Sequence, residues 1–193
     1  DGPAGDILLG GTTVASATAV ITTDAVGIDL TLVTEGTASG RVAFGDVDNS
    51  GNKYLQTFTA DADSPTGTDG LIRVNGIALA TSGTAVAGDI TLAGSRVEFS
   101  SPAVSLSTAN GATAVDAGAI DLTGTVAMIA AGAELSLDTS TSTPGRRGGA
   151  IRLDAVGALS AYPKALTLST SGPVAANAGE VFLGGDILLE GGN

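Results

Sequence analysis

The segment GDVDNSGNKY places oxygen-bearing side chains at alternate positions next to a glycine. Asp46, Asp48 and Ser50 precede that glycine, and this is the order of ligands and turn residue in the first half of an EF-hand calcium loop. Thr57 stands where a complete EF-hand carries its bidentate Glu. The sequence therefore predicts a calcium site at Asp46, Asp48 and Ser50. The alternative is a solvated turn, which Asp, Asn, Ser and Gly also form without a metal.

A second acidic stretch, DADSPTGTDG, follows in the same repeat. It supplies Asp61, Asp63 and Asp69, which we expect at the same corner of the fold. Farther along, the sequence STPGRRGG carries Arg146 and Arg147 in a long loop. Two adjacent guanidinium groups can contact an anion or an acidic glycan. The alternative is a solvated turn that lowers the negative net charge.

Catalytic chemistry is disfavoured by the residue types present. The chain has no His and no Cys, which excludes a Ser-His-Asp triad, a thiol nucleophile and a disulfide framework. Glycoside hydrolysis needs two carboxylates facing each other across a cleft. The outward candidates fall at different places in their repeats, so the pattern predicts no such pair; they are Asp89, Asp121, Asp154 and Asp186. We therefore expect that the protein is not an enzyme.

The charge balance limits the choice of partners. The 193 residues include 8 basic and 20 acidic side chains, a net charge of −12. Such a surface repels phosphate backbones and anionic lipid, so we expect no nucleic-acid partner. The sequence has no apolar run of about 18 residues, so we expect no membrane insertion.

A five-residue phrase recurs along the chain: Gly, any residue, Ile or Val, any residue, and a large apolar residue. The spacings between its copies are mostly 30 or 31 residues, with one of 35 and one of 18; the copies begin at Gly5, Gly40, Gly70, Gly88, Gly118, Gly149 and Gly179. Alternating apolar positions predict a strand with one buried face. A second phrase (apolar, any, apolar, any, Thr) follows in most repeats, and a third apolar patch such as Val126–Met128 or Val20 lies between the two.

The period predicts an all-β parallel β-helix, or β-solenoid, of about 30 residues and three short strands per coil. Matching phrases would stack about 4.8 Å apart and bury ladders of Ile and Leu. We expect one domain over residues 1–193, with coils starting near 5, 40, 70, 88, 118, 149 and 179. The coil from Gly70 would lack its middle strand. A right-handed coil is expected, because parallel crossovers are overwhelmingly right-handed.

Two outward features follow from this register. Asp121 would face Arg152 and Asp6 would face Arg41 on adjacent coils, as cross-strand pairing favours. The Thr of the second phrase would form a ladder at Thr34, Thr81, Thr108, Thr139 and Thr170. A hydroxyl ladder on a flat face is one way to bind ice; the alternative is a row of β-branched residues that stack and share hydrogen bonds.

The phrases GDITLAG, GAIDLTG, LTLSTSG and VSLSTANG resemble the repeats of filamentous-haemagglutinin-type exoproteins and autotransporter passengers of Gram-negative bacteria. The resemblance covers nearly the whole chain. It implies a secreted, extracellular protein associated with the cell surface, whose β-helix forms the shaft of a fibre. A β-helix also serves binding modules and carbohydrate-active enzymes, so fold alone does not decide the function.

The hypothesis that follows is a structural shaft or repeat segment of a secreted bacterial surface fibre or adhesin. The ending GGDILLEGG nearly repeats the opening GDILLGG, which favours a window of a longer tandem array. The expected partners are neighbouring coils, or copies of the chain end to end, and a host or matrix glycan or protein. The alternative function is a binding module for calcium, glycan or a host protein.

Overall fold

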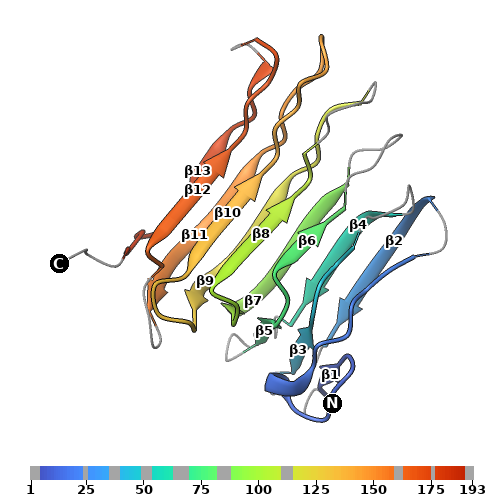
Figure 1. The fold of residues 1–193 in the computed structure, drawn as a ribbon, viewed down its shortest axis with the longest axis vertical. Coiled ribbons are helices and arrows are strands. Elements are labelled where there is room, and N and C mark those ends of the chain that lie inside the picture. Colours follow the sequence, from blue (N-terminus) through green and yellow to red (C-terminus); the bar gives the residue numbers. More distant parts are fainter. Residues whose placement is uncertain are drawn as a thin grey trace.

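The chain is a parallel β-solenoid with roughly 30 residues per turn, which confirms the predicted fold class. The computed structural model describes residues 5–23, 26–34, 40–48, 54–62, 70–81, 88–109, 115–158, 163–174 and 177–189. Strands from successive turns lie side by side and run in the same direction (Figure 1). The sequence period therefore reports one winding of the chain.

The described elements follow each other in a simple order. They are β1 (Ile7–Leu8), η1 (Val14–Ser16), β2 (Val26–Val33), β3 (Arg41–Phe44), β4 (Tyr54–Asp61), β5 (Leu71–Val74), β6 (Ala78–Ala80), β7 (Asp89–Phe99), β8 (Ala103–Ser107), β9 (Ile120–Met128), β10 (Glu134–Asp138), β11 (Ile151–Ala158), β12 (Ala165–Ser169) and β13 (Val181–Leu183).

Each turn passes through three faces. Face A holds β2, β4, the first parts of β7, β9 and β11, and then β13. Face B holds β1, β3, β5 and the second parts of β7, β9 and β11. Face C holds β6, β8, β10 and β12, preceded by single bridges at Ile21 and Val47. The core lies between the three faces.

The strands of faces A and B merge in the later turns, where three separate short strands were predicted. β7, β9 and β11 each run continuously through both faces, with a register shift where the chain bends. In β9 the bend coincides with Gly124, whose φ of +95° is a conformation that other residues rarely adopt. A bulge of this kind turns a strand without ending its pairing. One turn therefore contains one long bent strand and one short strand.

The predicted coil starts need a correction in the first half of the chain. The phrase from Gly70 does not stack on the phrase from Gly88: Ile72 pairs with Val97 on face B, whereas Ile90 pairs with Phe58 on face A. The phrases from Gly5, Gly40 and Gly70 all belong to face B, and those from Gly88 onward belong to face A. No strand is lost after Gly70. The spacing of 18 is a change of face.

The second phrase shifts in the same way. Leu30 and Leu32 lie on face A, where they pair with Phe58 and Ala60, while the later copies lie on face C. Ile77, predicted to point inward, is 61% exposed. Val20 was also wrong as a core residue, since it is exposed and its neighbour Ile21 is buried.

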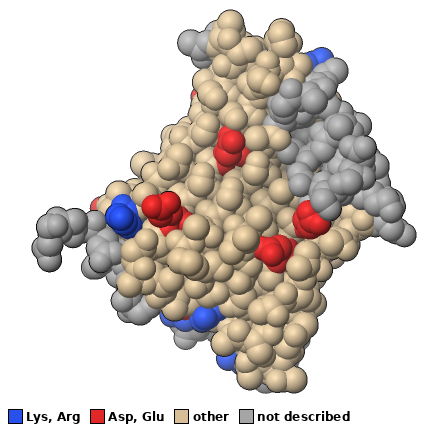
Figure 2. Space-filling model, in the orientation of Figure 1, with Lys and Arg blue, Asp and Glu red and all other residues tan. Residues whose placement is uncertain are grey.

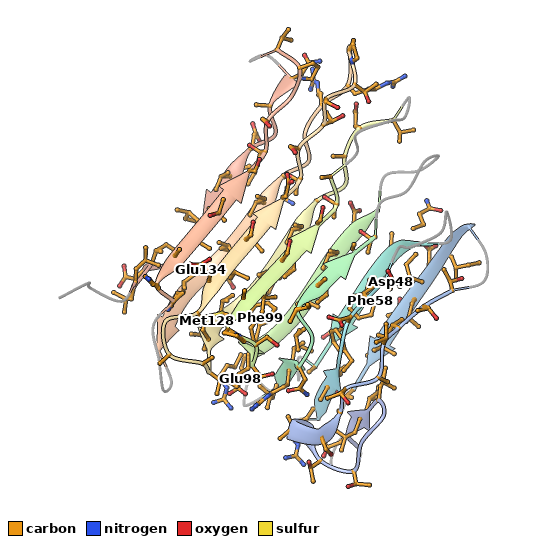
Figure 3. The ribbon with its side chains drawn as sticks, in the orientation of Figure 1. Asp48, Phe58, Glu98, Phe99, Met128 and Glu134 are labelled. Carbon is orange, nitrogen blue, oxygen red and sulfur yellow. The ribbon has the colours of Figure 1, made fainter. Side chains whose placement is uncertain are left out.

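The buried side chains form the predicted ladders. Ile90, Ile120 and Ile151 stack in register with no exposed surface, and they continue to Val181 on β13. Phe44 and Phe58 meet edge to face, with ring centroids 5.1 Å apart. Larger side chains therefore fill the wider parts of the core, as seen for Phe58, Phe99 and Met128 in Figure 3. Dense packing of this kind makes the coil a rigid unit.

Candidate functional site

Asp46 and Asp48 lie just after β3, on either side of the buried Val47, where the chain turns from face B to face C. Asp46 is half-buried, and its Oδ1 accepts the backbone N–H groups of Ile77 (2.6 Å) and Ala78 (2.9 Å). Both donors belong to the next turn. This carboxylate oxygen is therefore already used to join two turns of the coil.

Four further aspartates do the same work. Each accepts a backbone N–H from an adjacent turn: Asp6 from Arg41 (3.1 Å), Asp89 from Ala119 (2.7 Å), Asp116 from Arg147 (2.8 Å) and Asp154 from Gly124 (2.9 Å). Hydrogen bonds to a charged acceptor are stronger than those between neutral groups. The acidic composition therefore serves the stacking of the turns. Repeat reasoning missed this role, although the spacing of about 30 residues between donor and acceptor is its signal.

The calcium prediction rests on three residues that the structure treats differently. Ser50 lies outside the described residues, as do Asp63 and Asp69. Asp61 ends β4, which belongs to face A. Within the described ranges, no group of three His, Cys, Asp or Glu side chains lies close enough to hold a metal ion. Calcium binding at Asp46, Asp48 and Ser50 stays a prediction, in which Asp48 is the residue to test.

Millimolar calcium is expected to raise the melting temperature if this turn binds the ion, because a ligand that binds only the folded state stabilises it. The Asp48→Ala variant should lose the shift. Asp46→Ala is unsuitable, since it also removes the bonds to Ile77 and Ala78. Asp121→Ala, on face A, is the matched control and should keep the shift. Identical melting curves for the wild type with calcium and with a chelator would show that the turn is purely structural.

The threonine ladder points inward and is no ice-binding surface. Thr81, Thr108 and Thr139 have no exposed surface. Each hydroxyl donates to the carbonyl of the glycine that opens the next phrase; the pairs are Thr81–Gly88 (2.9 Å), Thr108–Gly118 (2.6 Å), Thr139–Gly149 (2.7 Å) and Thr170–Gly179 (3.0 Å). Thr34 differs, because its buried hydroxyl has no hydrogen-bond partner. The threonines therefore close the base of each loop between faces C and A.

Arg146 and Arg147 lie in the loop that follows β10. The peptide bond between them is held on both sides: Asn177 Nδ2 donates to the Arg146 carbonyl and the Arg147 N–H donates to Asp116, both at 2.8 Å. Neither guanidinium forms an ion pair within the described part of the chain. A fixed backbone thus presents two unpaired cations in an acidic protein.

A buried ion cluster on face B was not foreseen. Glu98 is 6% exposed and lies between two arginines, with Arg73 Nη1 at 3.1 Å and Arg96 Nε at 2.8 Å (Figure 3). Arg73 also donates to Asn75, whose amide reaches the carbonyls of the η1 segment. The strand that carries Glu98 has no opening glycine, so the phrase search passed over it. The cluster stabilises the stacking of β5 on β7.

The predicted outward pairs are confirmed. Asp121 lies 3.9 Å from Arg152, and Asp6 forms an ion pair with Arg41. The hydrogen bond from Arg41 lowers the pKa of Asp6, and the same bond raises the pKa of Arg41. Because the folded-state pKa of Asp6 is depressed, its contribution is present at neutral pH and is lost as the pH falls through that lowered value. Both side chains are largely solvated, so the contribution is small.

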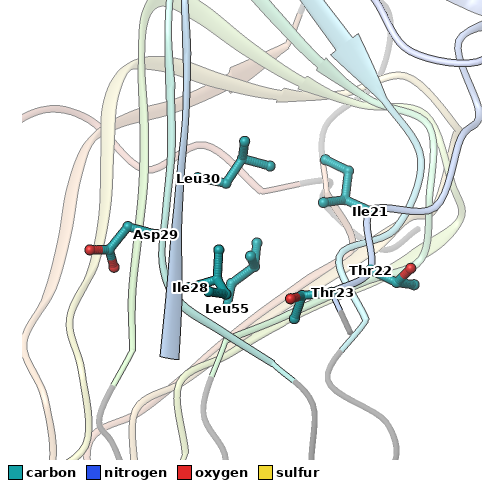
Figure 4. A pocket seen from close by; sticks show the side chains of 7 residues that line it. All are labelled: Ile21, Thr22, Thr23, Ile28, Asp29, Leu30 and Leu55. Atoms are coloured by element: carbon teal, nitrogen blue, oxygen red, sulfur yellow. The ribbon is translucent and has the colours of Figure 1, made fainter. Parts of the chain in front are cut away.

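Two hollows lie on the described surface. A cavity of about 490 Å³ opens between Ile21 and strands β2 and β4, with Ile28, Leu30 and Leu55 as its apolar lining (Figure 4). Its carboxylate, Asp29, accepts the Thr57 hydroxyl at 2.7 Å. A second hollow of about 440 Å³ lies across face C. Neither lining brings two carboxylates together among the described residues, so neither has the acid–base pair of a glycosidase.

The arrangement defines a β-solenoid whose polar side chains mostly hold one turn to the next. No protein-family model, curated protein or solved structure matches the chain. None of the described helical segments is long and apolar enough to serve as a membrane span.

Proposed function

We propose that the chain is a structural shaft segment of a secreted bacterial surface fibre or adhesin, and that it is not an enzyme. One observation carries the proposal. Turn after turn pairs in register with its neighbours on faces A, B and C, so the fold extends in one direction by about 4.8 Å per turn. The resemblance to filamentous-haemagglutinin-type repeats supports the extracellular location.

The outward polar groups support the same role. Aspartates that a catalytic site would need are bound to backbone N–H groups of adjacent turns, as at Asp89 and Asp154. Threonine hydroxyls are turned inward to glycine carbonyls, as at Thr139. Most of the polar chemistry of the described residues is thus directed along the coil. A rigid rod needs this, and an enzyme does not.

We further propose that copies of the 193-residue chain stack along the coil axis. β13 pairs with β11 on one side, and within the described residues no strand covers its other side; its Val181 and Leu183 are 42% and 52% exposed. β2 pairs with β4 on one side in the same way. Both edges belong to face A, so β13 of one copy can continue the ladder on β2 of another. Unpaired edges template such pairing.

End-to-end association should appear at high protein concentration and should increase with salt. The net charge of −12 opposes it, and screening shortens the repulsion to about 3 Å at 1 M salt. Light scattering across a salt series measures the effect. Because the contact is heterologous and does not close, the product should be filaments, which electron microscopy would show.

The Leu183→Glu variant places a charge on the β13 edge and should abolish the salt-dependent association. Ile77→Glu, an equally exposed apolar position on face C, should leave it intact. A wild-type chain that stays monomeric at high concentration and high salt would contradict axial stacking.

A binding module is the second candidate, favoured by the two unpaired guanidinium groups on a fixed loop. On this reading, the chain should bind a sulfated or carboxylated glycan in a glycan array. The double variant Arg146→Gln, Arg147→Gln should lose the signal, and Arg152→Gln, which removes a cation already paired with Asp121, should retain it. Equal binding by all three proteins would exclude this loop as the contact.

A further inference from the structure

Face C carries a shallow apolar groove that the shaft model does not use. The groove has a volume of about 440 Å³ and crosses β6, β8, β10 and β12. Its floor is built from outward side chains in register, namely Ala78, Ser105, Ser136 and Thr167. Because these side chains are short, the buried Val104 and Leu135 also contribute to its lining.

The face is also nearly uncharged. Glu134 is the charged residue among those that line the groove, whereas face A carries Asp29, Asp89 and Asp121 on its outer side. Figure 2 shows a broad neutral surface, with charged side chains at separate points on it. In a chain of net charge −12, this is the described face on which a second copy meets the least repulsion.

The two ends of the groove differ in shape. At the β6 end, Ile77 protrudes and is 61% exposed. At the β12 end, the lining consists of the smaller Ala165 and Thr167. A twofold axis parallel to the strands would place the β6 end of each copy on the β12 end of the other. The projecting Ile77 of one copy then fills the hollow beside Ala165 of the second, so the surface is self-complementary.

We propose that face C is a lateral contact between two copies of this chain, related by such a twofold axis and with antiparallel coil axes. The same rotation brings Glu134 next to Ser105 of the second copy, whose hydroxyl can donate to the carboxylate. An isologous contact of this kind closes as a dimer. It is independent of axial stacking, which uses the edges of face A.

The contact is small. Strands of about five residues at about 3.3 Å each, spaced about 4.8 Å apart, give a few hundred Å² per copy. Standard interfaces bury about 800 Å² per partner. We therefore expect a weak, concentration-dependent dimer in which removal of one apolar anchor is decisive, because the central apolar contacts dominate binding.

Cysteine crosslinking tests the arrangement directly, since the chain has no native Cys. Ala78→Cys and Thr167→Cys are made as separate variants, one carrying a mass label, and mixed with a short bismaleimide. The twofold contact predicts a crosslinked heterodimer in the mixture and none from either variant alone. Thr91→Cys, on the outer side of face A, is the control and should not crosslink to either.

Adding Ile77→Glu to the Ala78→Cys variant should abolish the heterodimer while leaving the melting temperature unchanged. Adding Leu183→Glu should leave the heterodimer intact, which separates this contact from axial stacking. Absence of the mixed crosslink, or equal self-crosslinking of each single variant, would overturn the proposal. Persistence of the crosslink in the Ile77→Glu variant would also overturn it.

Discussion

Replacing Ile120 with aspartate is expected to unfold the chain. Ile120 has no exposed surface and stacks between Ile90 and Ile151 on face A. The new carboxylate would enter a ladder of hydrocarbon side chains, and the nearest cation along the coil, Arg152, lies on the outer side. An uncompensated buried charge costs about 3–5 kcal/mol. Folded domains are stable by about 5–15 kcal/mol, so this loss is a large share of the total.

The adjacent position supplies the control. Asp121 lies on the outer side of the same strand, 3.9 Å from Arg152, which also lies over the Phe182 ring at 5.1 Å. Asp121→Ala should cost under about 1 kcal/mol, because exposed ion pairs contribute little. Urea unfolding followed by circular dichroism would compare the two variants. Similar losses of stability would show that the inside and outside of β9 are wrongly assigned.

The ladders could be predicted because the same phrase recurs with the same alternation. A period of 30 residues with Ile and Leu at fixed positions has few solutions other than a coil, and Ile120 was placed correctly between Ile90 and Ile151. The charge pairs followed from the same register, as Asp121 and Arg152 show. Wherever two phrases lie exactly one turn apart, sequence alone places their residues.

The choice of face could not be predicted in the first half of the chain. All three faces need the same alternation of inward and outward residues, so a phrase on face A reads like a phrase on face B. The assignment depends on loop lengths, and the loops there vary: the spacing from Ile7 to Val42 is longer than that from Ile72 to Val97. Pairing partners distinguish the faces, and a single sequence does not contain them.

The polar residues were harder still. Asp46 was interpreted as a calcium ligand because of its neighbours in sequence, whereas one of its oxygens serves Ile77 and Ala78 in the next turn. Thr139 was placed in a ladder correctly, but its inward direction comes from the closing loop that brings Gly149 within reach. A polar side chain has several partners in principle, and only the folded loop selects one.

The glycine that opens each phrase has a specific reason, and Gly149 shows it. A Cβ atom at Gly149 would lie far inside contact distance of the Gly118 carbonyl oxygen on the preceding turn. The same holds at Gly118 against Gly88, and at Gly179 against Gly149. The obstacle is backbone, which cannot swing aside as a side chain can. The column of glycines therefore lets the turns approach to pairing distance at this corner.

Gly149→Ala should accordingly be among the most damaging of the small substitutions. Two turns must separate to admit the methyl group, which strains the hydrogen bonds from Gly149 N to Thr139 O and from the Thr139 hydroxyl to Gly149 O. Overpacking typically costs about 1–3 kcal/mol. For a chain of this size, each kcal/mol lowers the melting temperature by about 2–4 °C. Thermal unfolding followed by circular dichroism would measure the shift.

Gly157→Ala is the matched control, because it makes the same chemical change on the outer side of the same strand. Gly157 pairs with Ala127, and its added Cβ would meet only Thr125 Cγ2, at an ordinary 3.5 Å. Alanine also restricts the unfolded chain more than glycine does, so this variant should match or slightly exceed the wild type in stability. A Gly149→Ala protein as stable as Gly157→Ala would mean that the turns are not held by backbone contact at the opening glycine. The phrase would then owe its glycine to flexibility of the loop that precedes it.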